Sequence, residues 1–143
     1  VGHLPAVLRQ GRICSCGVPD HAEAYASGPS LEAEYRRRTG EALNLRAIAR
    51  RVGQGDIVAR AVITEGAEVL GAAIGGANNV VDAAIVVVGG GVAALGDVFF
   101  EPMRIAAERE ALGASKSVRL VPVRFGPDAC LVGGGLAGLD AVS

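Results

Sequence analysis

Apolar residues recur at the spacing of helices through most of the chain, and two short apolar runs follow the pattern of strands. Between residues 45 and 52 the apolar side chains return to one face, which predicts an amphipathic helix that Asn44 can cap. The unbroken, β-branched run 83–88 is typical of a strand covered on both faces. In chain order, the pattern predicts helices over residues 22–27, 31–38, 45–52, 57–77, 97–111 and 129–141, and strands over 83–88 and 118–123.

Glycines and polar residues mark further features of the long helix 57–77. Asp56 can cap its start, and Asn78 and Asn79 tolerate the left-handed turn that would end it. Each glycine inside a helix costs about 1 kcal/mol in helix propensity relative to alanine. We therefore expect another element to pack very close to the glycines of this helix, which are Gly71, Gly75 and Gly76.

The alternation of helices and strands indicates an α/β fold. Half of the 143 residues are apolar and only 3% are aromatic, so alanine, valine, isoleucine and leucine must build the core. The formal net charge of −1 argues against a surface for nucleic acid or anionic membrane. The arginines at 36–38 and 46–51 have the spacing of a solvated helix face. The longest apolar run, 83–95, is broken by glycines and is too short to span a bilayer.

The candidate chemistry lies near the start of the chain. His3, Cys14, Cys16 and His21 can place four nitrogen and sulfur ligands around one tetrahedral Zn²⁺ with no position left for water. The alternative is that the spacing arises by chance and the thiols are buried apolar side chains. Three cysteines are too few for a secreted disulfide framework, and the close pair fits reduced thiolates in the cytosol. The third cysteine, Cys130, is expected to be a core thiol.

A glycine triplet, Gly89, Gly90 and Gly91, follows the strand 83–88 and precedes a predicted helix. A strand, a glycine-rich turn and a helix in this order can bring backbone N–H groups close to a phosphate or nucleotide. A tight turn that requires positive φ explains the same residues equally well.

Several of these residues together resemble the signature of the ROK family of bacterial sugar kinases and sugar-responsive repressors. That signature runs Glu-x-Gly-His, a gap, Cys-x-Cys-Gly-x-x-Gly-Cys-x-Glu and a Tyr-Ala-Ser-Gly-like tail. Here Val1-Gly2-His3, Cys14, Cys16, Gly17, Glu23 and Tyr25-Ala26-Ser27-Gly28 match it in order. Asp20 replaces a glycine of the signature and resists the backbone shape that glycine allows. His21 replaces its last cysteine, which is a change between two competent zinc ligands.

The resemblance implies the C-terminal lobe of a ribonuclease H-like, actin-type ATPase fold with a zinc-binding loop. It divides residues 1–143 into a zinc and sugar-contact loop, 1–28, and an α/β lobe, 29–143. It further implies that the family's N-terminal half, with its phosphate loop and catalytic Asp, is absent, so the chain is expected to be part of a longer protein. Close packing of the last helix at the domain hinge would explain the glycines at 133–135.

The resemblance also assigns roles to residues. His3 would bind zinc with Cys14, Cys16 and His21 and would also face the sugar, while Glu23 would hydrogen-bond sugar hydroxyls. Gly89, Gly90 and Gly91 would line the adenosine side of the ATP cleft. The implied cofactors are Zn²⁺ and ATP with Mg²⁺. The implied partners are a sugar, ATP and further copies of the chain, with DNA bound only through a separate upstream domain.

Three hypotheses for function follow. The first is a cytoplasmic, ATP-dependent kinase for a hexose or N-acetylhexosamine in the full-length protein. The second is a sugar-sensing repressor of the same family, and the third is a zinc-stabilised interaction module without a sugar. The discriminating residues would lie upstream, since a phosphate loop and catalytic Asp indicate the kinase and a helix-turn-helix indicates the repressor.

Overall fold

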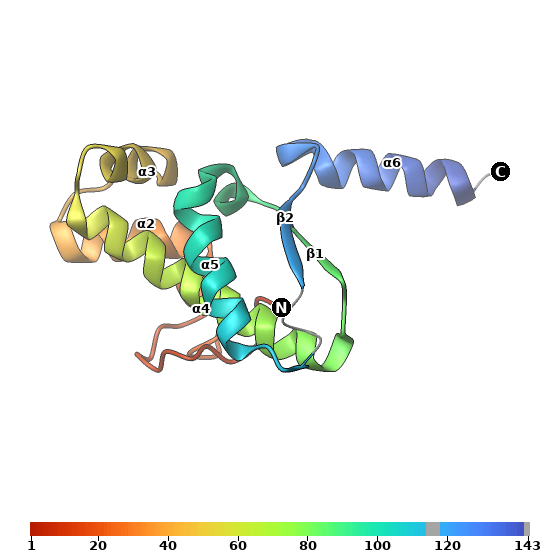
Figure 1. Ribbon diagram of the computed structural model, residues 1–143. Coiled ribbons are helices and arrows are strands. Elements are labelled where there is room, and N and C mark those ends of the chain that lie inside the picture. The colour runs from red at the N-terminus through yellow and green to blue at the C-terminus, as the bar shows by residue number, and fades with distance from the viewer. Residues whose placement is uncertain (114–117, 142–143) are drawn as a thin grey trace.

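The computed structural model describes residues 1–113 and 118–141 (Figure 1). A loop without regular secondary structure occupies residues 1–22, and the rest alternates helices with two strands. The elements in chain order are α1 (Glu23–Ala26), α2 (Gly28–Thr39), α3 (Leu45–Gly53), α4 (Ile57–Val81), β1 (Ile85–Val88), the 3₁₀ helix η1 (Gly91–Leu95), α5 (Asp97–Glu110), β2 (Arg119–Pro122), the 3₁₀ helix η3 (Gly126–Asp128) and α6 (Ala129–Ala141).

Helix α4 is the central element of the helical body, and it contacts α1, α2, α3 and α5. Its first turn is capped as expected, because the Asp56 carboxylate accepts hydrogen bonds from the backbone N–H groups of Val58 and Ala59 at 2.9 Å each. Asn44 caps α3 in the same way through the N–H of Ala47. The core lies between these helices, and its largest fully buried side chains are Tyr25, Tyr35, Phe99, Leu31, Ile48, Ile63, Met103, Val62 and Val69.

The close packing expected at the glycines of α4 is confirmed at two of the three. A Cβ on Gly71 would lie 2.1 Å from the carbonyl oxygen of Met103, and one on Gly75 would lie 2.3 Å from that of Ala107. Both carbonyls belong to α5, so the two helices approach each other through backbone. A Cβ on Gly76 would meet nothing within 4 Å.

The predicted end of α4 was wrong by one turn. The helix continues through Asn78 and Asn79 to Val81, and the C-cap residue Asp82 takes the left-handed conformation at φ 52°. The Asn78 amide holds the chain just after the helix, and the Asn79 amide makes a long-range contact. The Asn78 side chain bonds both the N–H and the carbonyl of Ala83, and the Asn79 side chain bonds the backbone of Glu110 and Leu112.

The two strands pair in parallel, with Ile85 opposite Arg119 and Val88 opposite Pro122. The expectation that the first strand is covered on both faces was wrong for the described chain, since Ile85 is 49% and Val87 60% exposed. Helix α6 extends away from the helical body (Figure 1).

Two expectations about α6 were also wrong. Cys130 is exposed and so is not a core thiol. A Cβ at any of the glycines 133–135 would meet nothing within 4 Å, so no described element packs closely there. Among the described residues, no helix is both long and apolar enough to cross a membrane.

Candidate functional site

Short backbone contacts shape the loop 1–22 around the Cys-x-Cys segment. Isolated bridges join Pro5 to His21 and Ile13 to Pro19, so the loop folds back on itself twice. The N–H of Cys14 donates to the carbonyl of Val18 at 3.0 Å. Within this turn Gly17 has a φ of 85°, which favours glycine. The turn holds both cysteines at one end of the loop, and the bridge at Pro5 brings in His21.

His3, Cys14, Cys16 and His21 meet in one cluster. One ligand atom from each lies within 4.8 Å of all the others. The Cys14 sulfur is 3.6 Å from Nδ1 of His3, and the Cys16 sulfur is 3.2 Å from Nδ1 of His21. Tetrahedral zinc with ordinary bond lengths separates a sulfur and a nitrogen ligand by about 3.6 Å. The two nitrogen and two sulfur donors therefore suit such an ion in type, and the two sulfur–nitrogen distances lie near this separation.

Glu23 lies beside this cluster, in the first turn of α1. One of its carboxylate oxygens accepts a hydrogen bond from the Ser15 hydroxyl at 2.6 Å, and the other lies 3.9 Å from Nε2 of His3. Its backbone N–H donates to the carbonyl of Gly2 at 2.9 Å. The carboxylate is thus fixed between two parts of the loop, and about one third of the side chain, 34%, stays exposed. It can accept hydrogen bonds from a ligand there.

Asp20 adopts the left-handed conformation, at φ 58°, in the place where the ROK signature has glycine. Its carboxylate accepts hydrogen bonds from the backbone N–H groups of Gln10 and Gly11 and from the buried Tyr25 hydroxyl. The Tyr25 hydrogen bond is the main cause that lowers the pKa of Asp20. Burial, followed by the same hydrogen bond, raises the pKa of Tyr25. Asp20 therefore takes a backbone shape that suits glycine while its side chain fastens the loop.

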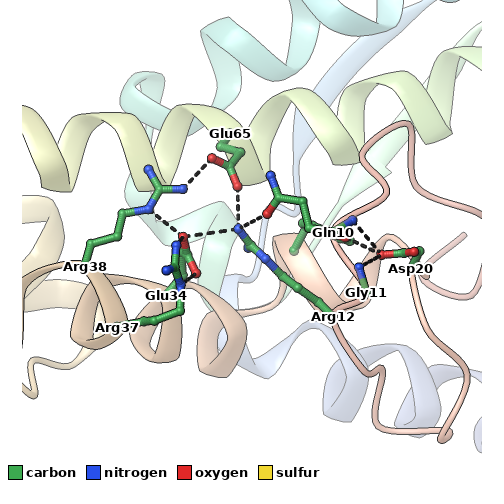
Figure 2. A network of polar contacts seen from close by, with 9 residues as sticks. Gln10, Gly11, Arg12, Asp20, Glu34, Arg37, Arg38 and Glu65 are labelled. Atoms are coloured by element: carbon green, nitrogen blue, oxygen red, sulfur yellow. Dashed lines mark hydrogen bonds and ion pairs between the residues drawn. The ribbon is translucent and has the colours of Figure 1, made fainter.

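An ion-pair network joins the loop to the helical body (Figure 2). Arg12 reaches Glu65 of α4 at 2.6 Å and Glu34 of α2 at 3.2 Å. Arg37 and Arg38 also contact Glu34, whose side chain is only 6% exposed. The Arg37 hydrogen bond is the main cause that lowers the pKa of Glu34 to about 2. Sequence reasoning missed this network; the only signal was the helical spacing of Glu34, Arg37 and Arg38.

The glycine turn borders a separate cleft of about 710 Å³ between α2, α3 and the ends of both strands. Gly90 has a φ of 87° and therefore requires the freedom of glycine. Gly90 and Gly91 line the cleft, whereas Gly89 does not. Sequence reasoning did not assign the remaining lining residues to a cleft; they are Gly28, Glu32, Asn44, Leu45, Arg46, Ala93, Ala94, Pro122, Val123 and Gly126.

Comparison with known proteins gives a family for these features. The model of the ROK family matches residues 1–139. The chain belongs to the ROK family. It is 38% identical over 93 residues to N-acetylmannosamine kinase from Escherichia fergusonii. The matched residues cover 64% of this chain and 32% of that protein.

Solved ROK structures share the fold of this chain. The ROK hexokinase from Thermus thermophilus has a TM-score of 0.80 at 30% identity, over 92% of this chain and 44% of its own. The ROK glucokinase from Streptomyces griseus, solved with glucose and AMPPNP, has a TM-score of 0.79 at 26% identity, over 92% and 48%. A ROK transcriptional regulator, a homolog of the E. coli MLC protein, has a TM-score of 0.76 at 24% identity, over 90% and 35%, which shows the fold alone.

These relatives confirm the α/β class and the actin-like ATPase fold of ROK sugar kinases. The chain spans about a third to a half of their length.

Proposed function

We propose that this chain is the sugar-gripping and nucleotide-facing part of a ROK sugar kinase that phosphorylates a hexose or N-acetylhexosamine with ATP and Mg²⁺. The observation that carries the proposal is the meeting of His3 and Glu23 beside the Cys-x-Cys segment, with one carboxylate oxygen 3.9 Å from the imidazole. Their partly exposed donor and acceptor atoms suit the vicinal hydroxyls of a sugar.

Zinc is the metal that the cluster fits best. Two thiols and two imidazoles form a closed tetrahedral set without a position for water, which is the composition of structural zinc sites. Bound there, Zn²⁺ would supply rigidity to the loop. His3 would then hold the ion through one ring nitrogen and present the other toward Glu23 and the sugar, as metal-bound histidines commonly do with carboxylates.

The chain's own groups would position substrates. The Ser15 hydroxyl and the Gly2 carbonyl fix Glu23 from two sides, so its carboxylate can accept hydrogen bonds from sugar hydroxyls without reorganising. The cleft beside Gly90 and Gly91 has a volume typical of small-ligand sites, and we assign it to the nucleotide. Phosphoryl transfer depends mainly on positioning and charge stabilisation, and a rigidly held Glu23 would position the sugar.

Relatives at 26% identity or more have names that describe kinases, and the ROK transcriptional regulator shares the same fold. No residue of this chain matches the family's phosphate loop or catalytic Asp. The 143-residue chain by itself is therefore expected to phosphorylate no sugar. Measurable sugar phosphorylation by the purified chain would contradict the proposal that the catalytic Asp and phosphate loop lie outside these residues.

Elemental analysis tests the metal part of the proposal. Protein purified without chelator should contain about one equivalent of zinc per chain. Less than about one tenth of an equivalent in a folded sample would remove zinc from the proposal.

A substitution at Glu23 tests the sugar part in the full-length protein. Glu23→Gln keeps the shape but turns one acceptor into a donor, so one sugar hydroxyl loses its partner. An unsatisfied buried group costs roughly 1–3 kcal/mol, so sugar affinity should fall about ten- to a hundredfold, and ATP affinity should change little.

Calorimetric titration with candidate hexoses measures this effect. Glu68→Gln, a change at an exposed position of α4, is the matched control and should leave sugar affinity unchanged. Equal affinities of the parent and Glu23→Gln, for a sugar that the parent binds, would remove Glu23 from the site.

A further inference from the structure

We propose that Arg12 is a positioning residue, which clamps the ligand-bearing loop onto the helical body and thereby preorganises the metal and sugar groups. This inference rests on the proposed metal site, although one of its tests does not require metal. Arg12 lies two residues before Cys14, and its guanidinium contacts Gln10 within the loop, Glu34 of α2 and Glu65 of α4 (Figure 2).

The loop requires such an anchor because it has little core of its own. Its residues form no helix or strand, and in 1–22 only Ala6, Cys14 and Ala22 are buried apolar side chains. Apolar burial is the main force that orders a chain segment, and three small side chains supply little of it. Polar contacts to a rigid partner must therefore carry much of the loop's order.

Arg12 is well placed to transmit the order of the helices to the loop. Its side chain is 17% exposed, and its guanidinium carbon lies 4.5 Å from the centre of the Tyr25 ring. Its backbone carbonyl accepts the N–H of Asp20 at 2.9 Å. Charge-assisted hydrogen bonds are roughly twice as strong as neutral ones, and a planar guanidinium can serve several carboxylates at once. One residue thus joins both arms of the loop to two helices.

The surrounding charges allow the contacts of Arg12 to be removed without unfolding the helical body. If Arg12 is removed, Glu65 keeps Arg38 and Glu34 keeps Arg37 and Arg38. Neither helix is left with an unpaired buried carboxylate, so Arg12→Met should fold. The matched control is Arg37→Met, because Arg37 also pairs with Glu34 but belongs to α2 and is 69% exposed.

Titration of the metal-free 143-residue chain with Co²⁺, followed by its visible absorption, gives the first measurement. We expect Arg12→Met to weaken Co²⁺ binding about tenfold, since charged hydrogen bonds that order the site are lost. Arg12→Lys should lie between, because the ammonium keeps the positive charge but loses the planar group that lies over the Tyr25 ring. Arg37→Met should change the affinity less than about twofold.

Amide hydrogen exchange in the absence of metal gives the second measurement. In Arg12→Met, the amides of Cys14 and Asp20 should exchange about tenfold faster or more, while amides in the middle of α4 keep their rates. Glu65→Gln, a change outside the loop, should accelerate the same loop amides. If Arg12→Met does not fold, this variant decides the question.

Two results would overturn the proposal. The first is unchanged hydrogen exchange of the loop amides in folded Arg12→Met or, if that variant does not fold, in Glu65→Gln. The second is an equal effect of Arg12→Met and Arg37→Met. If the parent chain binds no Co²⁺, the proposed metal site fails, and the exchange measurement still decides the role of Arg12.

Discussion

The loop 1–22 and the helix pair α4–α5 are held by opposite means. The helices meet through backbone and apolar side chains, with carbonyls of α5 directly over Gly71 and Gly75. The loop is held by hydrogen bonds and ion pairs, through Asp20 to its own backbone and through Arg12 to α2 and α4. Apolar packing tolerates little change in shape, whereas polar contacts depend on charge and on the conformation of a few residues.

Because of this difference, the residues that determine global stability are not the residues of the candidate site. The residues proposed to bind metal and sugar lie in or beside the loop, which is ordered by a small number of hydrogen bonds and ion pairs. The helix pair supplies the fixed surface to which those contacts attach. Substitutions in the pair should change global stability, and substitutions in the loop should change ligand binding with smaller effects on the fold.

The largest effect is expected at the helix contact. Gly71→Ala would place a Cβ 2.1 Å from the Met103 carbonyl oxygen and 2.9 Å from the Ala106 Cβ. The helices must separate, so the free energy of unfolding should fall by about 3 kcal/mol or more, beyond the usual cost of overpacking.

Urea denaturation measures the stability change at this contact, with Gly76→Ala as the control on the same helix. That position is open, so alanine should stabilise by about 0.5–1 kcal/mol through helix propensity. Similar changes in both variants would mean that the backbone contact between α4 and α5 does not limit stability.

The next largest effect is expected in the loop. Cys14→Ser removes a proposed thiolate ligand, and should weaken zinc binding at least about a hundredfold, the upper range seen when only an outer partner of a metal ligand is lost. Because ligation and loop order are coupled, the loop should also become more sensitive to protease. Cys130→Ser, at the exposed cysteine of α6, should change neither property. Unchanged protease resistance in Cys14→Ser would argue against the coupling.

The contrast between the two regions also explains what the sequence could predict. The apolar period predicted α3, α4 and α5 nearly to their ends, because burial of one face determines those helices. The glycines of α4 separately predicted that some element packs close to them, and the structure shows that this element is α5, at Gly71 and Gly75. Two other expectations were wrong: Cys130 is exposed, and strand 83–88 is covered on only one face, where Val86 and Val88 reach the core, because hydropathy reports which residues can be covered and not what covers them.

The loop has no such period, so its contacts could not be derived from spacing. The resemblance to the ROK signature named the residues of the cluster, and the structure brings His3, Cys14, Cys16 and His21 together. Their metal remains a prediction. Neither source indicated that Arg12 pairs with Glu65, because the two residues are 53 positions apart. Such long-range polar partners are fixed only by the complete fold.

Protonation of Glu34 offers a way to weaken the network without substitution. The folded-state pKa is about 2, against an ordinary value of 4.5. A lowered pKa stabilises the fold above the ordinary value, and this contribution is lost as pH falls from about 4.5 toward 2. The free energy of unfolding should decrease across that window by about 2–3 kcal/mol.

The measurement for Glu34 is a series of urea denaturations between pH 2 and pH 6. Glu34→Gln should be less stable at neutral pH, because three arginines lose a shared partner, and it should show a flatter dependence below pH 4.5. An equally steep dependence in the variant would assign the acid sensitivity to other carboxylates.

The smallest net effect is expected at Asp20, where two opposing terms meet in one residue. A non-glycine residue at φ 58° costs roughly 1 kcal/mol, whereas the carboxylate gains three hydrogen bonds to the loop and Tyr25. Asp20→Gly restores the residue of the ROK signature, removes the strain and loses the bonds, so it should destabilise by about 1 kcal/mol. Asp20→Ala loses the bonds and keeps the strain, so it should cost about 1 kcal/mol more than glycine. Asp20→Asn keeps an acceptor oxygen and tolerates the conformation, so it should cost least. The order asparagine, glycine, alanine in urea denaturation would support this account, and an alanine variant as stable as the glycine variant would show that the backbone at residue 20 is not strained.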